Sequence, residues 1–599
     1  NAMGNTIVND VAADITDSTV TAFNDVSLAA SDMAPTVVSA LNIPDNREDE
    51  VTAAFDDSDS PFGLASFTDA NILALNLSVA GSGLVAVDVN LTGNVITNTV
   101  LTTIDNSTVT ATNGNLTSAA ESSAVITSLS LGVGASSAIS VGVVGFGNVI
   151  TNTTESVIRN GATVAAGGAL ALGAADRSSI GSIGLSISGS GGMAVSAIVG
   201  YNEISNTVTS EIAGATTSVE SDGAMSLAAM SDADILSFTG GVAASGVVSA
   251  QVSTSINTID NTVTADISDA GITADGGLSL SARDLSTVDS VAVGASGSGF
   301  GAAGAAVSKN LIDNSVEATI TASTITAGVG GVSLTAESPA LIRSFAAGIS
   351  GSGLAAGQAS VTLNEINNTI TAKIDDSTVN STGTVSLLAS DEAPDTIPDF
   401  LADMLIPTDT ITQATDNLDG ESVDQAANIV SFAASIAVSG GVAGSAAVAE
   451  NTITNTVTAQ VIDSDLTVTS GDIDVAARSG SRISTLSAGI GVAGGLSLNA
   501  SVSVNTIGNT IEASIEEDSE ISASGTVGLT AEDDSRIDSL TFSVAGALVG
   551  ALGGAVVTNN IDNDVSAFIK GTSTDTTRLI EANQVTLLAD SSQTVRGRS

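Results

Sequence analysis

The residues of this chain that could take part in chemistry are almost all carboxylates and amides. It has 65 Asp and Glu, 14 Lys and Arg, no His and no Cys. Without imidazole or thiol groups, the Ser-His-Asp and Cys-His catalytic arrangements and the usual zinc sites are excluded. Carboxylate pairs could still hydrolyse glycosides, and carboxylate clusters could hold a hard cation, so these two chemistries remain open.

The most regular polar feature is the pattern Asn-x-Ile-x-Asn, which occurs ten times, with its first Asn at 5, 94, 148, 202, 257, 310, 364, 451, 505 and 559. Residues at i and i+4 of a strand point the same way, so stacked copies are expected to form ladders of hydrogen-bonded amides. The alternative is a row that binds a glycan or an ion. The second Asn of each copy is predicted to form a structural ladder: Asn9, Asn98, Asn152, Asn206, Asn261, Asn314, Asn368, Asn455, Asn509 and Asn563.

An acidic run near the N-terminus is the candidate metal site. Oxygen ligands of this kind suit calcium, the only cofactor that the sequence suggests, although the spacing of an EF-hand loop is absent. The plain alternative is a solvated acidic loop. The candidate ligands are Asp45, Glu48, Asp49, Asp56, Asp57 and Asp59.

The spacing of the Asn motifs defines a repeat of 54 residues. Within it, apolar residues alternate with polar ones between Gly, Asn, Asp and Ser, which predicts about four or five short strands and no helix. A unit this small cannot bury its own core, so stacked units predict an all-β solenoid. A right-handed β-helix is favoured, with a flattened two-sheet β-roll as the alternative. With two or three coils in each unit, the rod would span on the order of 100–150 Å.

Two copies are longer than the rest, by 35 and 33 residues. The expected divisions are a first repeat over 1–93 with an insert at about 36–70, five regular repeats over 94–363, a second inserted repeat over 364–450 with its insert at about 395–427, and two regular repeats with a truncated tenth over 451–599. Six of the seven prolines lie in the inserts, as expected because proline removes a ladder donor. Such inserts often carry binding sites.

The formal net charge of −51 limits the partners of this chain. Nucleic acids and anionic lipid surfaces attract basic proteins, so neither is an expected partner. The apolar stretches are broken by Gly and Ser and alternate with polar residues, so no membrane-spanning helix is expected. The acidic surface favours solubility and repulsion between chains.

Three stretches carry a family resemblance: VAGSGLVAVDVNLTGNVITNTV (79–100), GIGVAGGLSLNASVSVNTIGNTIEASI (489–515) and the V-x-L-x-A-x-D strand that follows. They resemble the repeats of giant bacterial filamentous adhesins, including leukotoxin-type adhesins and the autotransporter or haemagglutinin-like class. The resemblance covers nearly the whole chain except the inserts. It implies an exported β-solenoid on the bacterial cell surface, of which this chain is expected to be a segment.

The expected function is therefore a structural stalk or filament segment of a bacterial cell-surface adhesin, located outside the cell, and not an enzyme. A glycan or surface-protein ligand would be bound by the inserts or by regions outside this segment. A self-assembling extracellular matrix or sheath protein is the first alternative. A carbohydrate-active β-helix enzyme is the second, although no charged constellation occurs only once, as a catalytic site should.

Overall fold

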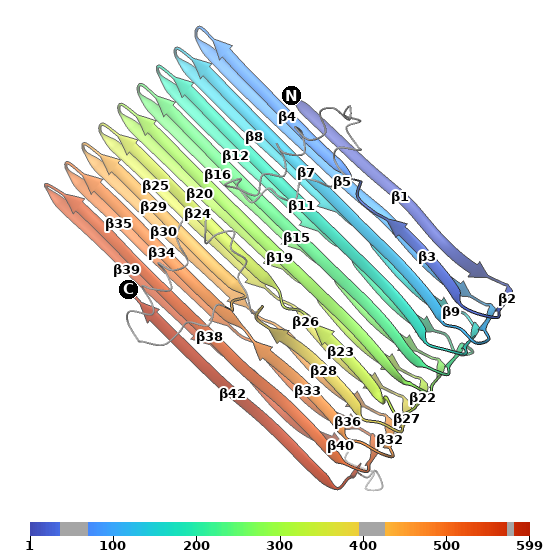
Figure 1. Ribbon diagram of the computed structural model, residues 1–599. Helices are drawn as coiled ribbons and strands as arrows, with labels where there is room; N and C mark the ends of the chain where they lie inside the picture. Colours follow the sequence, from blue (N-terminus) through green and yellow to red (C-terminus); the bar gives the residue numbers. More distant parts are fainter. Residues whose placement is uncertain (36–69, 395–425, 572–579) are drawn as a thin grey trace.

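The computed structural model describes residues 1–35, 70–394, 426–571 and 580–599. Within these ranges the regular elements are all β-strands, which form three parallel sheets running the length of the molecule (Figure 1). The chain is therefore a β-solenoid, as the sequence predicts. None of the described residues forms a helix that could cross a membrane.

Sheets A and C form the two long sides of each coil, and sheet B closes one end. Sheet A contains β1 (Ala2–Thr16), β5 (Val85–Asp105), β8 (Ile139–Ile150), β9 (Thr153–Arg159), β12 (Met193–Ile204), β13 (Thr207–Ala213), β16 (Val248–Ile259), β17 (Thr262–Ser268), β20 (Gly301–Ile312), β21 (Ser315–Thr321), β25 (Ala355–Ile366), β26 (Thr369–Asp375), β30 (Val442–Ile453), β31 (Thr456–Ile462), β35 (Leu496–Ile507), β36 (Thr510–Glu517), β39 (Gly550–Ile561) and β40 (Asp564–Gly571).

Sheet B is built from short strands, one in each coil. They are β2 (Thr19–Ala22), β6 (Thr108–Ala111), β10 (Thr163–Ala166), β14 (Ser218–Ser221), β18 (Gly271–Ala274), β22 (Thr324–Ala327), β27 (Thr378–Ser381), β32 (Asp465–Val468), β37 (Glu520–Ala523) and β41 (Ile580–Glu581).

Sheet C returns the chain to the far end of the coil. Its strands are β3 (Val26–Asp32), β4 (Ile72–Ser82), β7 (Leu116–Ser136), β11 (Leu170–Ser190), β15 (Ala224–Ser245), β19 (Gly277–Ser298), β23 (Val332–Glu337), β24 (Leu341–Ser352), β28 (Val385–Glu392), β29 (Ile429–Ser439), β33 (Ile473–Gly480), β34 (Arg482–Ala493), β38 (Thr526–Ala547) and β42 (Gln584–Arg598).

Each 54-residue repeat makes one coil, so the expectation of two or three coils was wrong. Asn94 pairs directly with Asn148 of the next repeat, and the same register continues along sheet A. The expected short strands are also wrong for much of the fold, because β7 and β11 each have 21 residues. Such an arm is about 70 Å long, whereas ten coils stack over only about 43 Å. The solenoid is thus wider than it is tall, and it is not the expected rod.

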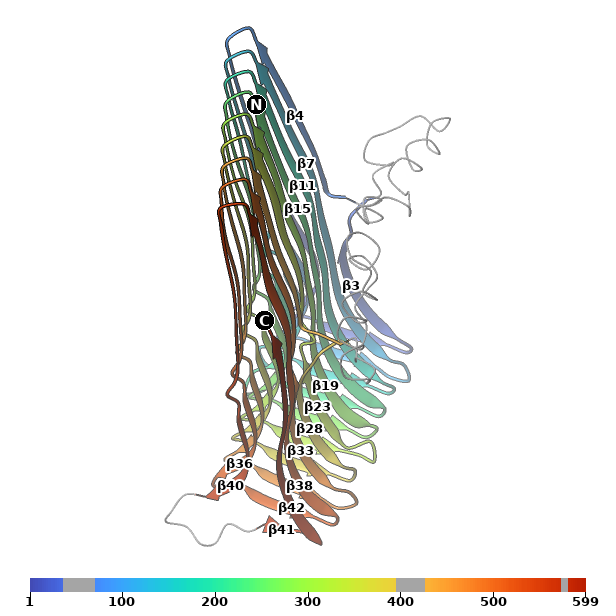
Figure 2. The same cartoon turned by 90° about the vertical axis from the view of Figure 1, so that its left-hand side faces the viewer.

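The coil is flattened, with sheets A and C facing each other along most of their length. Figure 2 shows a wedge that is narrow at the turns joining sheet C to sheet A and wider at sheet B. We call the narrow half the blade; the other described residues form the base. The blade consists of nine segments: 75–92, 129–146, 183–200, 238–255, 291–308, 345–362, 432–449, 486–503 and 540–557.

The base has a conventional core of stacked aliphatic side chains. Ile104, Val109 and Leu116, from the three sheets of one coil, are fully buried and belong to one cluster that runs through the stack. Burial of a side chain of this size stabilises the fold by about 1.5–3 kcal/mol relative to exposure. The outward positions of the base hold Thr, Ser and charged residues, so the usual alternation of a half-buried strand applies here.

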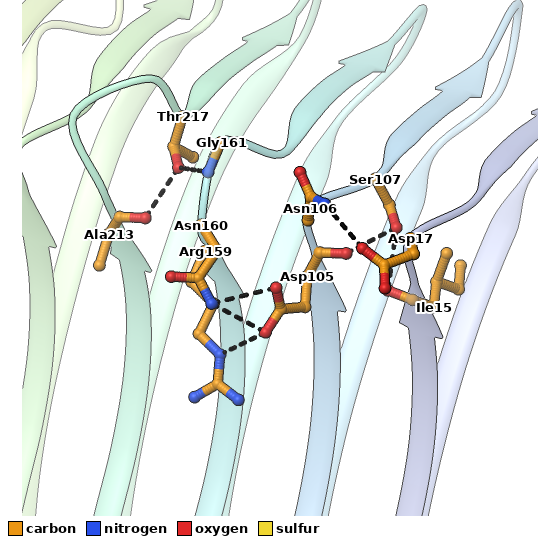
Figure 3. A network of polar contacts seen from close by, with 10 residues as sticks. All are labelled: Ile15, Asp17, Asp105, Asn106, Ser107, Arg159, Asn160, Gly161, Ala213 and Thr217. Carbon is orange, nitrogen blue, oxygen red and sulfur yellow. Dashed lines mark hydrogen bonds and ion pairs between the residues drawn. The ribbon is translucent and has the colours of Figure 1, made fainter.

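The corner between sheets A and B has one left-handed residue in most coils, such as Asp17, Asn106 and Asn160 with φ of 50°, 45° and 57°. Asp and Asn tolerate this conformation better than other side chains, which explains their recurrence in the turn. Polar contacts then tie neighbouring corners together (Figure 3). Asp105 accepts hydrogen bonds from Asn160 and from Arg159 Nε at 3.0 Å, and together these bonds lower the pKa of Asp105.

The blade reverses the inside–outside pattern of the base. Most of its inward positions hold small or polar residues such as Ser130, Gly132 and Gly134, while Leu129 and Leu131 point outward from the same strand. Small inward residues let the two sheets approach closely. A Cβ on Gly184, for example, would collide with Phe146 and Ile198 of the facing sheet. Large inward side chains are therefore few in the blade, and Val144, Phe146 and Ile198 fit inside where facing or neighbouring glycines leave room for them.

Both inserts leave the coil from sheet C, at the junction of base and blade. The first lies between β3 and β4, and the second lies between β28 and β29. Strands on either side of each insert pair in register with one continuous neighbouring coil. The backbone N–H of Ala70 donates to the carbonyl oxygen of Pro35 at 3.0 Å, so the first insert begins and ends at one point of the coil.

Candidate functional site in the coil interior

The Asn-x-Ile-x-Asn motif supplies three adjacent inward rows of sheet A. Its first Asn forms an uninterrupted ladder through all ten coils, in which each side-chain amide donates to the side-chain oxygen of the next. The bond from Asn148 to Asn202 is 2.8 Å, for example, and that from Asn310 to Asn364 is 2.7 Å. The ladder satisfies amides that water cannot reach.

The middle residue of the motif forms an aliphatic row between the two Asn rows. Ile96, Ile150 and Ile204 from sheet A are fully buried and belong to the same cluster as Ile126 and Ile180 from sheet C. A slip of the register would place an Ile against an amide row and leave buried polar groups without partners. Together the three rows therefore fix which residues of successive coils pair.

The second Asn of each motif also forms a continuous row, in which every coil is linked to the next. The predicted bonds between neighbouring side chains of this row are not formed. The side-chain oxygen of each Asn instead accepts from the backbone N–H of the Asn in the preceding coil, for example at 2.8 Å between Asn206 and Asn152. The same bond recurs from Asn9 to Asn563. The amide nitrogens of most members bond to side chains opposite, as Asn152 and Asn206 do to Asp176, whereas that of Asn98 has no partner.

Facing these amides, sheet C presents a row in which Asp and Ser alternate coil by coil. The row reads Asp32, Ser122, Asp176, Ser231, Asp284, Ser338, Asp391, Ser479, Asp533 and Ser591. Directly stacked carboxylates would lie about 4.8 Å apart, and an intervening Ser doubles that separation. The alternation thus limits repulsion between buried charges, which a low-dielectric interior would strengthen.

Each buried carboxylate of this row is held by several donors. Asp284 accepts from Asn261 at 3.2 Å, from Asn314 at 2.7 Å and from Ser286 at 2.6 Å. Burial nevertheless dominates and raises the pKa of Asp284 to about 6, although these hydrogen bonds act in the opposite direction. Burial likewise raises the pKa of Asp391 to about 6 and raises that of Asp176. Asp284 and Asp391 should therefore change their protonation between mildly acidic and neutral pH.

The Asp and Ser row is not among the features predicted from the sequence, although a signal for it exists. The Asp of the V-x-L-x-A-x-D strand recurs in alternate repeats, so that Asp176 and Asp284 are separated by two 54-residue units. All members from Ser122 to Asp533 are buried, as are the Asn side chains opposite them from Asn98 to Asn509. An external glycan cannot reach these rows without opening the coil. The role of these rows is structural, since their hydrogen bonds join each coil to the next.

A hollow at the root of the second insert has a volume of about 350 Å³. It is bordered by Glu392 and Ala426, where the chain leaves sheet C and returns to it. Arg478 Nε pairs with Glu532 at 3.2 Å, and a terminal nitrogen of Arg482 pairs with Asp534 at 3.2 Å. Because both guanidinium groups already face carboxylates, the hollow is not a ready-made anion site.

The candidate calcium ligands Asp45, Glu48, Asp49, Asp56, Asp57 and Asp59 all lie outside the described residues. Among the described residues, no three side chains of the types that ligate metals come together as a site that could hold an ion. Calcium binding by the first insert therefore stays a prediction from the sequence.

Comparisons with known proteins give no match for this chain. No protein-family model, no curated protein and no solved structure is similar to it at a significant level. Its function is therefore argued from its own residues and geometry.

Proposed function

We propose that this chain is a structural stalk or filament segment of a bacterial cell-surface adhesin, with ligand binding carried by the inserts or by regions outside the segment. The observation that carries the proposal is the unbroken register of ten coils, held by the buried Asn rows. No described coil departs from the pattern to gather a unique set of reactive side chains. Such regularity suits mechanical continuity better than catalysis.

The inserts are the natural place for recognition, because they are the largest departures from the repeat. Both leave sheet C at the same position along the coil. In a longer stack, inserts at this position would therefore belong to one face. The strands before and after each insert stay paired with a neighbouring coil. The solenoid would then act as the rigid support and the inserts as the exchangeable binding elements.

A test compares the full chain with a variant that lacks residues 36–69 and 395–425, each gap bridged by a short Gly-Ser linker. Circular dichroism should show unchanged strand content, because the insert ends lie beside each other in the coil and the flanking strands keep their partners. We expect binding to a panel of glycans and matrix proteins to be lost on deletion. Each binding assay is run with calcium and with a chelator. If the full chain binds in calcium and loses binding in the chelator, the first insert is implicated, because it contains the candidate calcium ligands.

Binding that survives deletion of both inserts would contradict the proposed role of the inserts. Absence of binding by either variant would instead favour the second candidate, a self-assembling extracellular matrix or sheath protein. One observation favours that candidate. Each coil of 54 residues extends the stack by only about 4.8 Å, so most of the mass builds width and not reach.

A further inference from the structure

The sheet A face of the blade is apolar over four successive outward rows. In-register pairing stacks them through nine coils, for example from Val85 through Ile139 and Met193 to Gly550. These rows hold only Val, Leu, Ile, Met, Ala and Gly apart from Thr254. None of their residues is buried. An apolar surface of this extent on a water-soluble protein indicates an interaction site.

The blade is also almost free of charge, in contrast to the rest of the chain. Its nine segments contain one ionisable side chain, that of Asp88, which points inward and is buried. All but one unit of the net charge of −51 therefore belongs to the rest of the chain. On sheet A the charges begin just below the apolar rows, with Glu203, Lys309 and Glu450. The apolar face thus has a charged border on one side only.

The area of this face is sufficient for a stable protein–protein contact. Nine coils at a spacing of about 4.8 Å set one dimension of the face. Its four outward rows take up about eight residues along each strand, at about 3.3 Å per residue, so the area is roughly 1,000 Å². A standard interface buries about 800 Å² on each partner. Flat sheets with small side chains also pack face to face at about 10 Å, as in β-sandwiches.

The opposite face of the blade is a weaker candidate, although it is apolar too. Both inserts depart from sheet C at its lower border, whereas sheet A continues through every coil without such a departure. Three outward residues of β24 at this border, Leu341, Arg343 and Phe345, are already only 4%, 4% and 7% exposed. The sheet A face is therefore the continuous and accessible one.

We propose that the sheet A face of the blade binds a second copy of this chain, with the two blades overlapping face to face about a two-fold axis and the two bases at opposite ends. This orientation follows from charge and shape. Side-by-side bases would bring two strongly acidic surfaces together, whereas opposite ends separate them by about the 25 Å of the blade, well beyond a Debye length of about 8 Å. Two wedges in opposite orientation also stack flat (Figure 2).

A bilayer is the main competing occupant of an apolar face, and the backbone argues against it. At whichever coil a stack ends, the blade presents a row of unpaired N–H and C=O groups. Hydrocarbon cannot satisfy these groups, and water can do so when two blades pair in solution. The proposal deepens the second candidate function given above, since paired blades would join separate solenoids into a layer. It requires nothing of the inserts.

The test is sedimentation velocity of the full chain over a wide range of concentrations, with matched pairs of substitutions. The test variant is Val199→Glu with Val442→Glu, on the sheet A face, where these side chains are 48% and 43% exposed. The control is Ile187→Glu with Ile349→Glu, on the sheet C face, where they are 41% and 54% exposed. We expect the wild-type chain to dimerise, the test pair to weaken the dimer about a hundredfold or more, and the control pair to leave it unchanged.

Salt added above physiological ionic strength should change the wild-type dimer little, because the opposed arrangement already places the acidic bases several Debye lengths apart. A wild-type chain that stays monomeric at every concentration would overturn the proposal, as would a dimer weakened only by the sheet C pair. An association indifferent to both pairs would locate the contact at the coil edges and also overturn it. Monomers that float with phosphatidylcholine vesicles would identify hydrocarbon as the occupant instead. None of these outcomes depends on the ligand-binding experiment with the insert deletions.

A second readout uses the absence of Cys from the chain. Val252 lies near the middle of the sheet A face, so a single Val252→Cys substitution should give an efficient dimer with a short bifunctional maleimide. Thr209→Cys on the outer face of the base is the control and should remain uncross-linked. Equal cross-linking at both positions would contradict the opposed arrangement of the two bases.

Discussion

The row of buried carboxylates predicts that the fold becomes less stable as the pH rises through 6. The pKa of Asp284 is 3.8 in its ordinary state and about 6 in the fold, and the same holds for Asp391. Since the folded pKa is the higher one, the fold binds protons more tightly than the unfolded chain does. The stabilising contribution is therefore complete below pH 4 and is lost as the pH rises through 6. Two pKa units correspond to about 3 kcal/mol for each residue.

The perturbation that isolates this effect is Asp284→Asn, measured by thermal unfolding between pH 4.5 and pH 8. Asn resembles the protonated carboxyl group, so at pH 4.5 the unfolding midpoint should stay close to that of the wild type. At pH 8 the variant should be the more stable protein, and its stability relative to the wild type should rise by about 2 kcal/mol between pH 4.5 and pH 8, since the wild type has lost only about 1 of the 3 kcal/mol at pH 4.5. Asp222→Asn, at an exposed turn residue, is the control for the general loss of one negative charge.

The converse substitution tests the alternation itself. Ser338→Asp would place a third carboxylate between Asp284 and Asp391, about 4.8 Å from each. We expect marked destabilisation at pH 8 and substantial recovery at pH 4.5, where neighbouring carboxyl groups can be neutral. The reasoning would be refuted if Asp284→Asn kept the pH dependence of the wild type, or if Ser338→Asp were tolerated equally at both pH values.

Three further substitutions test the packing of single coils by chemical denaturation. Asn257→Ala should cost about 1–3 kcal/mol, because it removes two buried bonds of the ladder, those to Asn202 and Asn310, whereas Asn5→Ala in the first coil should cost less; equal costs would contradict the ladder. Ala322→Gly should stabilise the fold by about 1 kcal/mol, since Ala322 has φ of 49°, and a loss of stability would show that its methyl group matters more than its backbone. Gly184→Ala should cost about 1–3 kcal/mol, because its new methyl group would collide with Phe146, and adding Phe146→Leu should restore part of that loss; no rescue would point to a different cause.

Several features of the fold could be predicted because they depend on short stretches of sequence. The alternation within the repeat indicates strands, and the fixed spacing of the Asn motifs indicates stacked units. The polar turn at Asp463 and Ser464 does separate β31 from β32, with Asp463 in the left-handed conformation that turns require. These features need no knowledge of what lies across the coil.

The height of the stack could not be predicted in the same way. The Gly residues inside the repeat look like strand ends, which divided the unit into short strands and suggested two or three coils. In the structure many of them lie within continuous strands. Gly132 and Gly134 of β7, for example, provide room for residues of the facing sheet. A Gly that marks a turn and a Gly that allows two sheets to approach are indistinguishable until the facing strand is known.

By itself, the sequence determined the all-β solenoid, the 54-residue period, the positions where the inserts depart and the stacking of the Asn rows from repeat to repeat. Only the tertiary structure decided that one repeat makes one coil, that Asp and Ser alternate opposite the second Asn row, and that the blade turns its aliphatic residues outward. The physical reason is the same in each case. Alternation along a strand defines two faces, but only the distance to the opposing sheet decides which face can be buried. In the blade that distance admits Ser and Gly, so Val and Leu remain on the outside.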